Sequence, residues 1–362
     1  MHRTLHATLL ILAAGFLSCA PGTSAWAETP REVLTKQYSP QTYQAQRLYH
    51  DISVMTVGDG PSRAYVFIPR NPARQNLPVI LFHHGWLGMN PKNFGGLIDV
   101  LVRKGNVVIY PVYQDGNDTA PQLVTSIAGQ ADAAALARLK TAYPGLIDTD
   151  RALYLGFSMG ATISLNLAID PARYGLPTPR ALMLISPGDA HHVARGPQAA
   201  SIIGRVEALP ATLPTVVVSG FADTSIGVPT ARAVAARMCH LPEKNRLLIF
   251  FPSDSNGSTH IQAGHGSPGA PDSRYDFPDS RVRVTTSIPW KEDFEPSGSL
   301  NLLDYYGYWR IATTLADFVA TGSPLTDLFD RQAPANHFLG FWPDGTAYAA
   351  PVLEDPCLTV TH

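Results

Sequence analysis

A serine between two glycines has the setting in this chain that most suggests covalent chemistry. Ser158 is the middle residue of GFSMG (156–160), after an apolar run and before a segment of helical composition. A serine exposed on a strained strand-to-helix turn can attack a carbonyl carbon. The flanking glycines lack Cβ atoms, so strand and helix can approach closely around it. We predict that Ser158 is a nucleophile; the alternative is a polar residue that only ends a strand.

A serine nucleophile needs a general base and an acid that orients the base. In a strand–turn–helix architecture the chain order is Ser, acid, His. Asp223, in GFAD (220–223), directly follows a later apolar run and is the predicted acid. Asp189, after the preceding run, is the alternative. Either carboxylate could instead cap a helix or a turn.

Two histidines follow the last apolar run, in the stretch from Asn256 to Leu300. We favour His260 as the base because it is closer to the strand end and follows the small, flexible NGST. His265 is the first alternative; the second is a more distant histidine, in which case both of these are ordinary loop residues.

The negative charge that develops on an attacked carbonyl oxygen needs two fixed N–H donors. One comes from the residue after the nucleophile, Met159. The second is predicted from the loop after an early apolar run, where LFHHGW (81–86) presents the N–H of Trp86. The alternative is that this HHG stretch is only a turn that ends a strand.

These residues need a framework that brings them together. Short runs that are apolar throughout alternate with helical patterns, which is typical of a parallel sheet covered on both faces by helices. The apolar runs cover residues 64–69, 77–85, 105–113, 151–158, 180–189, 214–223 and 245–254. Helices are expected over 125–140 and 159–170, with a closing helix between 301 and 322. The Gly-, Pro-, Ser- and Asp-rich residues 256–300 are predicted to be a long irregular loop.

The combination of HHGW, GFSMG, GFAD and a late histidine resembles the α/β-hydrolase superfamily, over roughly residues 64–322. Within it, the chain is similar to secreted esterases, cutinase-like polyesterases and dienelactone-hydrolase-like proteins. The resemblance implies an α/β-hydrolase fold, a doubly wound and mostly parallel sheet. It places the nucleophile at Ser158, the acid at Asp223 and the oxyanion donors at Trp86 and Met159. The histidine maps least cleanly.

The first 27 residues are typical of a secretory signal peptide: Arg3, a short apolar run, and a small-x-small site at residues 25–27. Residues 28–362 are then expected to form a single domain, secreted or periplasmic. Lipoprotein anchoring through Cys19 is one alternative, and a buried N-terminal helix is another. Cleavage would leave Cys239 and Cys357, an even count that favours one disulfide in an oxidising compartment. Two separate buried thiols are the alternative.

The sequence thus predicts a secreted serine hydrolase that cleaves small-molecule or polymeric esters. A peptidase, thioesterase, acyltransferase or catalytically silent binding protein remains an alternative. The net charge of -2 argues against a nucleic-acid partner. No metal-ligand spacing or phosphate-binding glycine loop is evident, so no cofactor is expected. The natural substrate and the oligomeric state stay open.

Overall fold

The computed structural model describes residues 28–70, 75–278 and 298–358. The predicted signal peptide, with Cys19, lies outside these residues. Within the described residues, no helix combines the length and the apolar character needed to cross a membrane.

A nine-stranded sheet organises the described chain, in the order β1-β2-β4-β3-β5-β6-β7-β8-β11. The strands from β4 to β8 in this order run parallel, whereas β1, β2 and β11 run antiparallel to their neighbours. The strands are β1 (Ile52–Val57), β2 (Ala64–Pro69), β3 (Leu77–His83), β4 (Val107–Pro111), β5 (Ile147–Phe157), β6 (Pro179–Ile185), β7 (Thr215–Gly220), β8 (Arg246–Phe251) and β11 (Val352–Glu354). This mostly parallel sheet confirms the predicted α/β-hydrolase fold.

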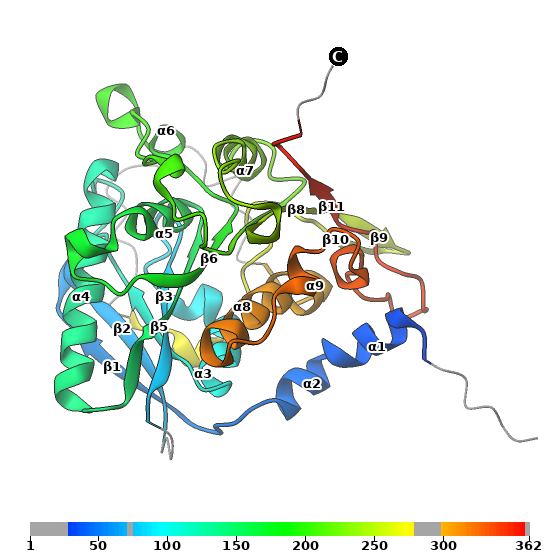
Figure 1. Ribbon diagram of the computed structural model, residues 1–362, viewed down its shortest axis with the longest axis horizontal. Helices are drawn as coiled ribbons and strands as arrows, with labels where there is room; N and C mark the ends of the chain where they lie inside the picture. The colour runs from blue at the N-terminus through cyan, green and yellow to red at the C-terminus, as the bar shows by residue number, and fades with distance from the viewer. Residues whose placement is uncertain (1–27, 71–74, 279–297, 359–362) are drawn as a thin grey trace, which may run out of the picture.

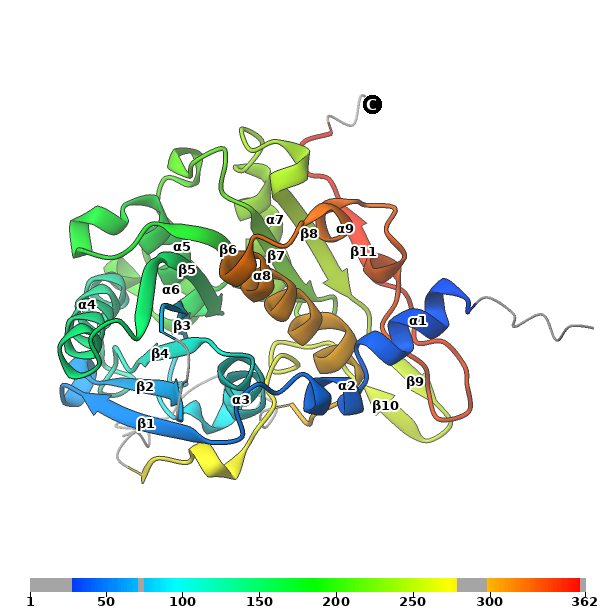
Figure 2. The same ribbon diagram turned by 60° about the horizontal axis from the view of Figure 1, so that its bottom comes forward.

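Helices cover both faces of the sheet (Figures 1 and 2). Helices α3 (Gly95–Arg103) and α8 (Trp309–Thr321) pack on one face; α4 (Val124–Ala142), α5 (Met159–Ile169) and α7 (Gly227–Ala236) pack on the other. Alternate strand residues enter the two cores, because successive side chains of a strand point to opposite faces. On β3, Ile80 joins the α3 and α8 side and Leu81 the opposite side. This two-sided burial explains the uniformly apolar runs.

Four short helices complete the set in the described residues: α1 (Pro30–Gln37), α2 (Pro40–Ala45), α6 (Ala190–Val193) and α9 (Thr326–Phe329). Helix α1 begins at a capping box, in which the Thr29 hydroxyl accepts from the Glu32 N–H and the Glu32 side chain accepts in return. Helix α2 packs on α8, with the ring of Tyr43 edge-on to Trp309 at 5.5 Å. The chain's first described helices are thereby fixed to the outside of one helical layer.

The stretch predicted as an irregular loop, 256–300, contains local structure in its described part. A hairpin of β9 (Asp254–Asn256) and β10 (Thr259–Ile261) opens it. Farther along, Ala270 is buried, and its carbonyl accepts from the N–H of Gly96 at the start of α3. The sequences DSN and THI have no apolar period, so the hairpin could not be read from hydrophobic pattern. Residues 279–297 lie outside the described part.

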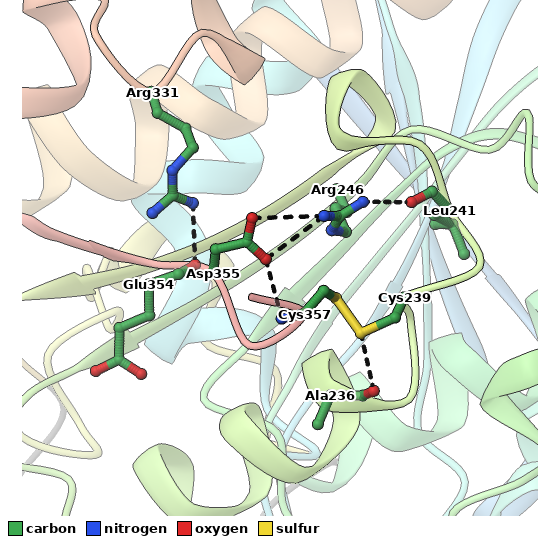
Figure 3. Close-up of a disulfide and its surroundings, with 8 residues drawn as sticks. All are labelled: Ala236, Cys239, Leu241, Arg246, Arg331, Glu354, Asp355 and Cys357. Carbon is green, nitrogen blue, oxygen red and sulfur yellow. Dashed lines mark hydrogen bonds and ion pairs between the residues drawn. A yellow bond between two sulfur atoms is a disulfide. The ribbon is translucent and has the colours of Figure 1, made fainter. Parts of the chain in front are cut away.

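The last described residues lie near the end of α7, where the structure joins Cys239 to Cys357 (Figure 3). An ion pair and a hydrogen bond hold the same segment: Arg246 lies 3.4 Å from a carboxylate oxygen of Asp355, and Arg331 donates to the Glu354 carbonyl at 3.0 Å. The disulfide stays a prediction that a mass measurement tests, but the contacts around it already fasten the tail to β8.

Candidate active site

Ser158 occupies a tight turn between β5 and α5. Its backbone has φ 54° and ψ −122°, a conformation that non-glycine residues rarely adopt. A Cβ at Gly156 would lie 2.1 Å from the Gly160 carbonyl oxygen, and one at Gly160 would lie 2.1 Å from the His83 carbonyl oxygen. Both positions therefore need glycine, because strand, turn and helix touch there. This is the strained strand–turn–helix arrangement that the sequence motif predicts.

A chain of two hydrogen bonds joins Ser158 to a carboxylate through a histidine. His265 Nε2 lies 2.9 Å from Ser158 Oγ, and His265 Nδ1 lies 2.6 Å from Asp223 Oδ2. Ser158 and Asp223 are 7% and 3% exposed. With a neutral ring, Nδ1–H donates to the carboxylate, which leaves Nε2 to accept the serine proton. This is the arrangement that activates a serine for acyl transfer.

The base favoured from the sequence, His260, is not at this site, and the structure replaces it with the alternative, His265. His260 lies on β10, where its Nδ1 is 2.7 Å from the Ser255 hydroxyl. The hairpin carries residues 254–261 away from the sheet edge. The chain returns at Ala263, whose carbonyl accepts from the Ala222 N–H at 3.0 Å, next to the acid. The histidine that follows this return, rather than the one nearest the strand end, reaches Ser158.

Asp189, the alternative acid, caps a helix, which is the structural role that the sequence analysis gave as an alternative to catalysis. Its Oδ1 accepts from the backbone N–H groups of Ala190 and Ile202, at 2.7 and 2.8 Å. Its own N–H donates to His192 Nδ1. Asp189 thus starts α6 and closes the loop behind it, whereas Asp223 faces the histidine.

Contacts with Tyr308 and Phe157 hold the segment that carries His265. Ser267 Oγ donates to the Gly264 carbonyl at 2.7 Å and lies 2.9 Å from the Tyr308 hydroxyl. Tyr308 ends a π-helical turn, Leu303–Tyr308, which leads directly into α8. The ring of Phe157 packs against His265 at 4.9 Å. Sequence analysis missed this support, since its only local signal is a polar residue two positions beyond the histidine.

The two predicted oxyanion donors flank Ser158. Met159 is the first residue of α5, whose leading N–H groups have no partner inside the helix. Trp86 and Met159 line the same cavity as Ser158. The loop carrying Trp86 is braced, because Leu87 N–H donates to the Gln114 side chain at 2.8 Å and Tyr113 OH donates to the His84 carbonyl. Bracing of this kind keeps donors in place before a charge develops.

A second buried cluster lies next to the Ser158 turn, on the α4 and α5 side of the sheet. His83 Nε2 is 2.9 Å from Asp132 Oδ2, and its Nδ1 is 2.7 Å from Ser164 Oγ. The side chains of His83 and Asp132 are fully buried. Burial raises the pKa of Asp132 above its ordinary value, and the contact with His83 offsets only part of this increase. The cluster ties the end of β3 to α4 and α5, and its sequence signal is a polar residue at an otherwise apolar position in each element.

The cavity above Ser158 has a volume of about 320 Å³. One wall comes from the α6 segment, which here means residues 188–195. Burial lowers the pKa of His192 in this wall, so its ring is neutral near pH 7. Within the described residues, no group of three or more His, Cys, Asp or Glu side chains is arranged to hold a metal ion.

No protein-family model and no curated protein matches the chain. Among solved structures, it is similar to a variant of the esterase rPPE, with 19% identity and a TM-score of 0.42 over 58% of this chain and 76% of that one. It is also similar to EstE1, a thermostable carboxylesterase cloned from a metagenomic library, with 18% identity and a TM-score of 0.44 over 64% and 89%. An esterase of Pyrobaculum calidifontis gives 14% identity and a TM-score of 0.42 over 63% and 86%. At these identities, the proposed chemistry depends on the site's own geometry.

Proposed function

We propose that this α/β-hydrolase-fold chain is a serine hydrolase that cleaves carboxylic esters through an acyl-enzyme. The observation that carries the proposal is the unbroken hydrogen-bond chain from Ser158 through His265 to Asp223. The strained backbone of Ser158 supports it, because such strain persists mainly where function needs it.

In the proposed reaction, Ser158 Oγ attacks the ester carbonyl carbon while His265 Nε2 takes the hydroxyl proton. The carbonyl oxygen becomes negative and accepts from the N–H groups of Trp86 and Met159. When the tetrahedral intermediate collapses, His265 gives its proton to the departing alcohol. Water then attacks the acyl-enzyme, with His265 again as base, and the acid leaves. Asp223 holds the ring orientation and stabilises the imidazolium, without taking a proton itself.

The test distinguishes the loss of the nucleophile from a general loss of folded protein. A fluorophosphonate probe should label the protein at Ser158, and p-nitrophenyl esters should give a burst of one p-nitrophenol per site. Ser158→Ala should remove labelling and lower kcat by about 10⁶, as loss of the nucleophile does in comparable triads. Ser164→Ala is the matched control, since its hydroxyl faces His83 rather than the cavity. An unlabelled wild-type protein, or a Ser158→Ala variant with wild-type turnover, contradicts the proposal.

We also propose that the protein is exported and that residues 1–27 are removed. The sequence pattern of that segment and the pairing of Cys239 with Cys357 support this. The mass of the protein recovered outside the cytoplasm should correspond to a chain that begins at Glu28. A mature chain that begins at a lipid-modified Cys19 would instead show that the protein is a membrane-anchored lipoprotein.

A further inference from the structure

The α6 segment forms a firmly held wall over the nucleophile. A Cβ at Gly188 would lie 3.1 Å from Ser158 Oγ, so the wall begins in contact with the reacting atom. The Gly188 N–H donates to the Ser158 carbonyl at 2.9 Å, and its carbonyl accepts from the Thr162 hydroxyl at 2.5 Å. Asp189 then caps α6 and ties it to Ile202. The backbone of this segment therefore has a defined position relative to Ser158.

Arg195 brings a cation to this wall. It lines the cavity that contains Ser158. Its Nη1 donates to the carbonyls of His191 and Ala194, at 3.2 and 3.0 Å, which folds the guanidinium back on its own segment. No carboxylate of the described residues forms an ion pair with it. A guanidinium carries five N–H donors in a fork that matches a carboxylate, so most of its donor capacity is available.

The other charged groups of the cavity do not cancel this cation. Both lining carboxylates, Asp189 and Asp223, are 3% exposed. Asp189 is engaged by two backbone N–H groups, and Asp223 faces His265. Burial lowers the pKa of His192, which keeps it neutral near pH 7. His191 is exposed and lies 3.5 Å from Asp189. Among the described residues that line the cavity, Arg195 is therefore the permanent cation, because arginine stays protonated.

Apolar side chains complete the cavity: Trp86, Met159, Val193 and Ile226. We infer that the preferred substrate is an ester whose apolar body carries a carboxylate, such as the half-ester of a dicarboxylic acid, and that Arg195 recognises this carboxylate. The inference rests on the proposed ester hydrolysis at Ser158 and names its substrate class. Arginine suits this role, since its planar fork can bind both carboxylate oxygens.

Two esters with the same carbon skeleton test the inference: monomethyl suberate and dimethyl suberate. The rate of hydrolysis is measured by titrating the acid that is released. For wild type, kcat/KM should be higher for the half-ester, and the ratio should fall as salt is raised, because the Arg195 charge is exposed. Arg195→Gln should lower kcat/KM for the half-ester about three- to tenfold more than for the diester, the range expected for one solvated charge-assisted contact. Arg195→Lys should keep part of the preference. Arg205→Gln, which removes an exposed arginine outside the cavity lining, should leave the ratio unchanged.

The outcomes separate the two proposals. Equal losses on both esters in Arg195→Gln, or a loss of the same size in Arg205→Gln, overturn the inference while ester hydrolysis stands. A wild-type preference for the diester overturns it as well. If wild type cleaves neither suberate ester, the inference fails. Ester hydrolysis at Ser158 is judged separately, by labelling with the fluorophosphonate probe and by the turnover of p-nitrophenyl esters in wild type and Ser158→Ala.

Discussion

Asp223 Oδ2 lies 2.6 Å from His265 Nδ1, although 42 residues separate them in the chain. The two loops that carry them are joined by a backbone hydrogen bond from Ala222 N–H to the Ala263 carbonyl. A Cβ at Gly220 would lie 2.0 Å from that same carbonyl oxygen, so the acid loop needs glycine at this position. The contact between Asp223 and His265 is thus supported by the backbone.

Replacing the acid by its amide should damage catalysis and leave the fold intact. In Asp223→Asn, the side chain can no longer favour the ring form that has its proton on Nδ1, so kcat for p-nitrophenyl esters should fall by about 10⁴. Asp189→Asn keeps an acceptor for the α6 cap and should cost less than about tenfold. A larger loss in Asp189→Asn than in Asp223→Asn would contradict the assignment of the acid.

The two histidines of one segment should behave oppositely. His265→Ala removes the only imidazole that contacts Ser158 in the described residues, and kcat should fall by about 10⁶, as for loss of the nucleophile. His260→Ala breaks an exposed contact with Ser255 and should leave kcat within about twofold. Steady-state assays of both purified variants decide this. A severe loss confined to His260→Ala would restore the assignment made from sequence.

Tyr308→Phe should disturb the position of the base. The variant loses the hydroxyl that contacts Ser267, two residues beyond His265. We expect a fall in kcat of about tenfold with KM little changed, and a stability loss near 1 kcal/mol for one buried hydrogen bond. Ser267→Ala should produce at least this fall, because it also loses the hydrogen bond to the Gly264 carbonyl. The double variant should be no worse than Ser267→Ala alone, because that variant has already lost the contact with Tyr308. Additive losses would show that Tyr308 acts by another route.

The stability of the protein should carry a pH signature from Asp304. This side chain is fully buried, and burial raises its pKa well above the ordinary value. Below about pH 4 it is protonated in both states. As pH rises, the carboxyl of the unfolded chain ionises first, which favours the unfolded state. The free energy of unfolding of wild type therefore falls, by about 1.4 kcal/mol for each pH unit by which the folded-state pKa exceeds the unfolded one. Asp304→Asn does not titrate, and its stability relative to wild type should rise from pH 4 to pH 7. Equal urea midpoint differences at both pH values would contradict this.

Reduction of the Cys239–Cys357 bond should cost less than its loop length suggests. A bridge across a separation of 118 residues corresponds to about 5 kcal/mol on the chain-entropy estimate, which is a ceiling. The pairing of β11 with β8, and the Arg246–Asp355 contact, hold the tail without it. Cys239→Ser should lower the unfolding midpoint but leave ester turnover intact. Uptake of two alkylating groups by unreduced mature protein would show that both thiols are free.

Local patterns predicted the part of the site that is local. Ser158, the glycines around it and the following helix are adjacent in sequence, so the motif contains the turn's geometry. The buried strands were equally visible, because each is apolar on both faces. Strands β1 and β11 were not, since β1 is only partly buried and β11 has three residues.

The choice between the two histidines depends on backbone contacts that the hydrophobic pattern does not reveal. Both lie in a polar segment without periodicity. The hairpin pairs residues 254–256 with 259–261 and carries His260 away from the site. The Ala222–Ala263 bond, which returns the chain to Asp223, links positions 41 residues apart. Arg195 is a similar case. Its sequence setting is an ordinary exposed loop, and only the folded position of α6 brings it to the wall of the cavity.

The three residues of β11 determine what the far edge of the sheet offers to other molecules. Without them, β8 would present its unpaired N–H and C=O groups and its apolar sequence RLLIFF as a template for a strand of another chain. Covered by an antiparallel strand, with Arg232 paired to Glu354 outside it, that edge is blocked. By covering the edge of β8, the C-terminal segment prevents that edge from pairing with other chains. A protein truncated before Val352 should therefore be less soluble, even if Ser158, His265 and Asp223 keep their positions.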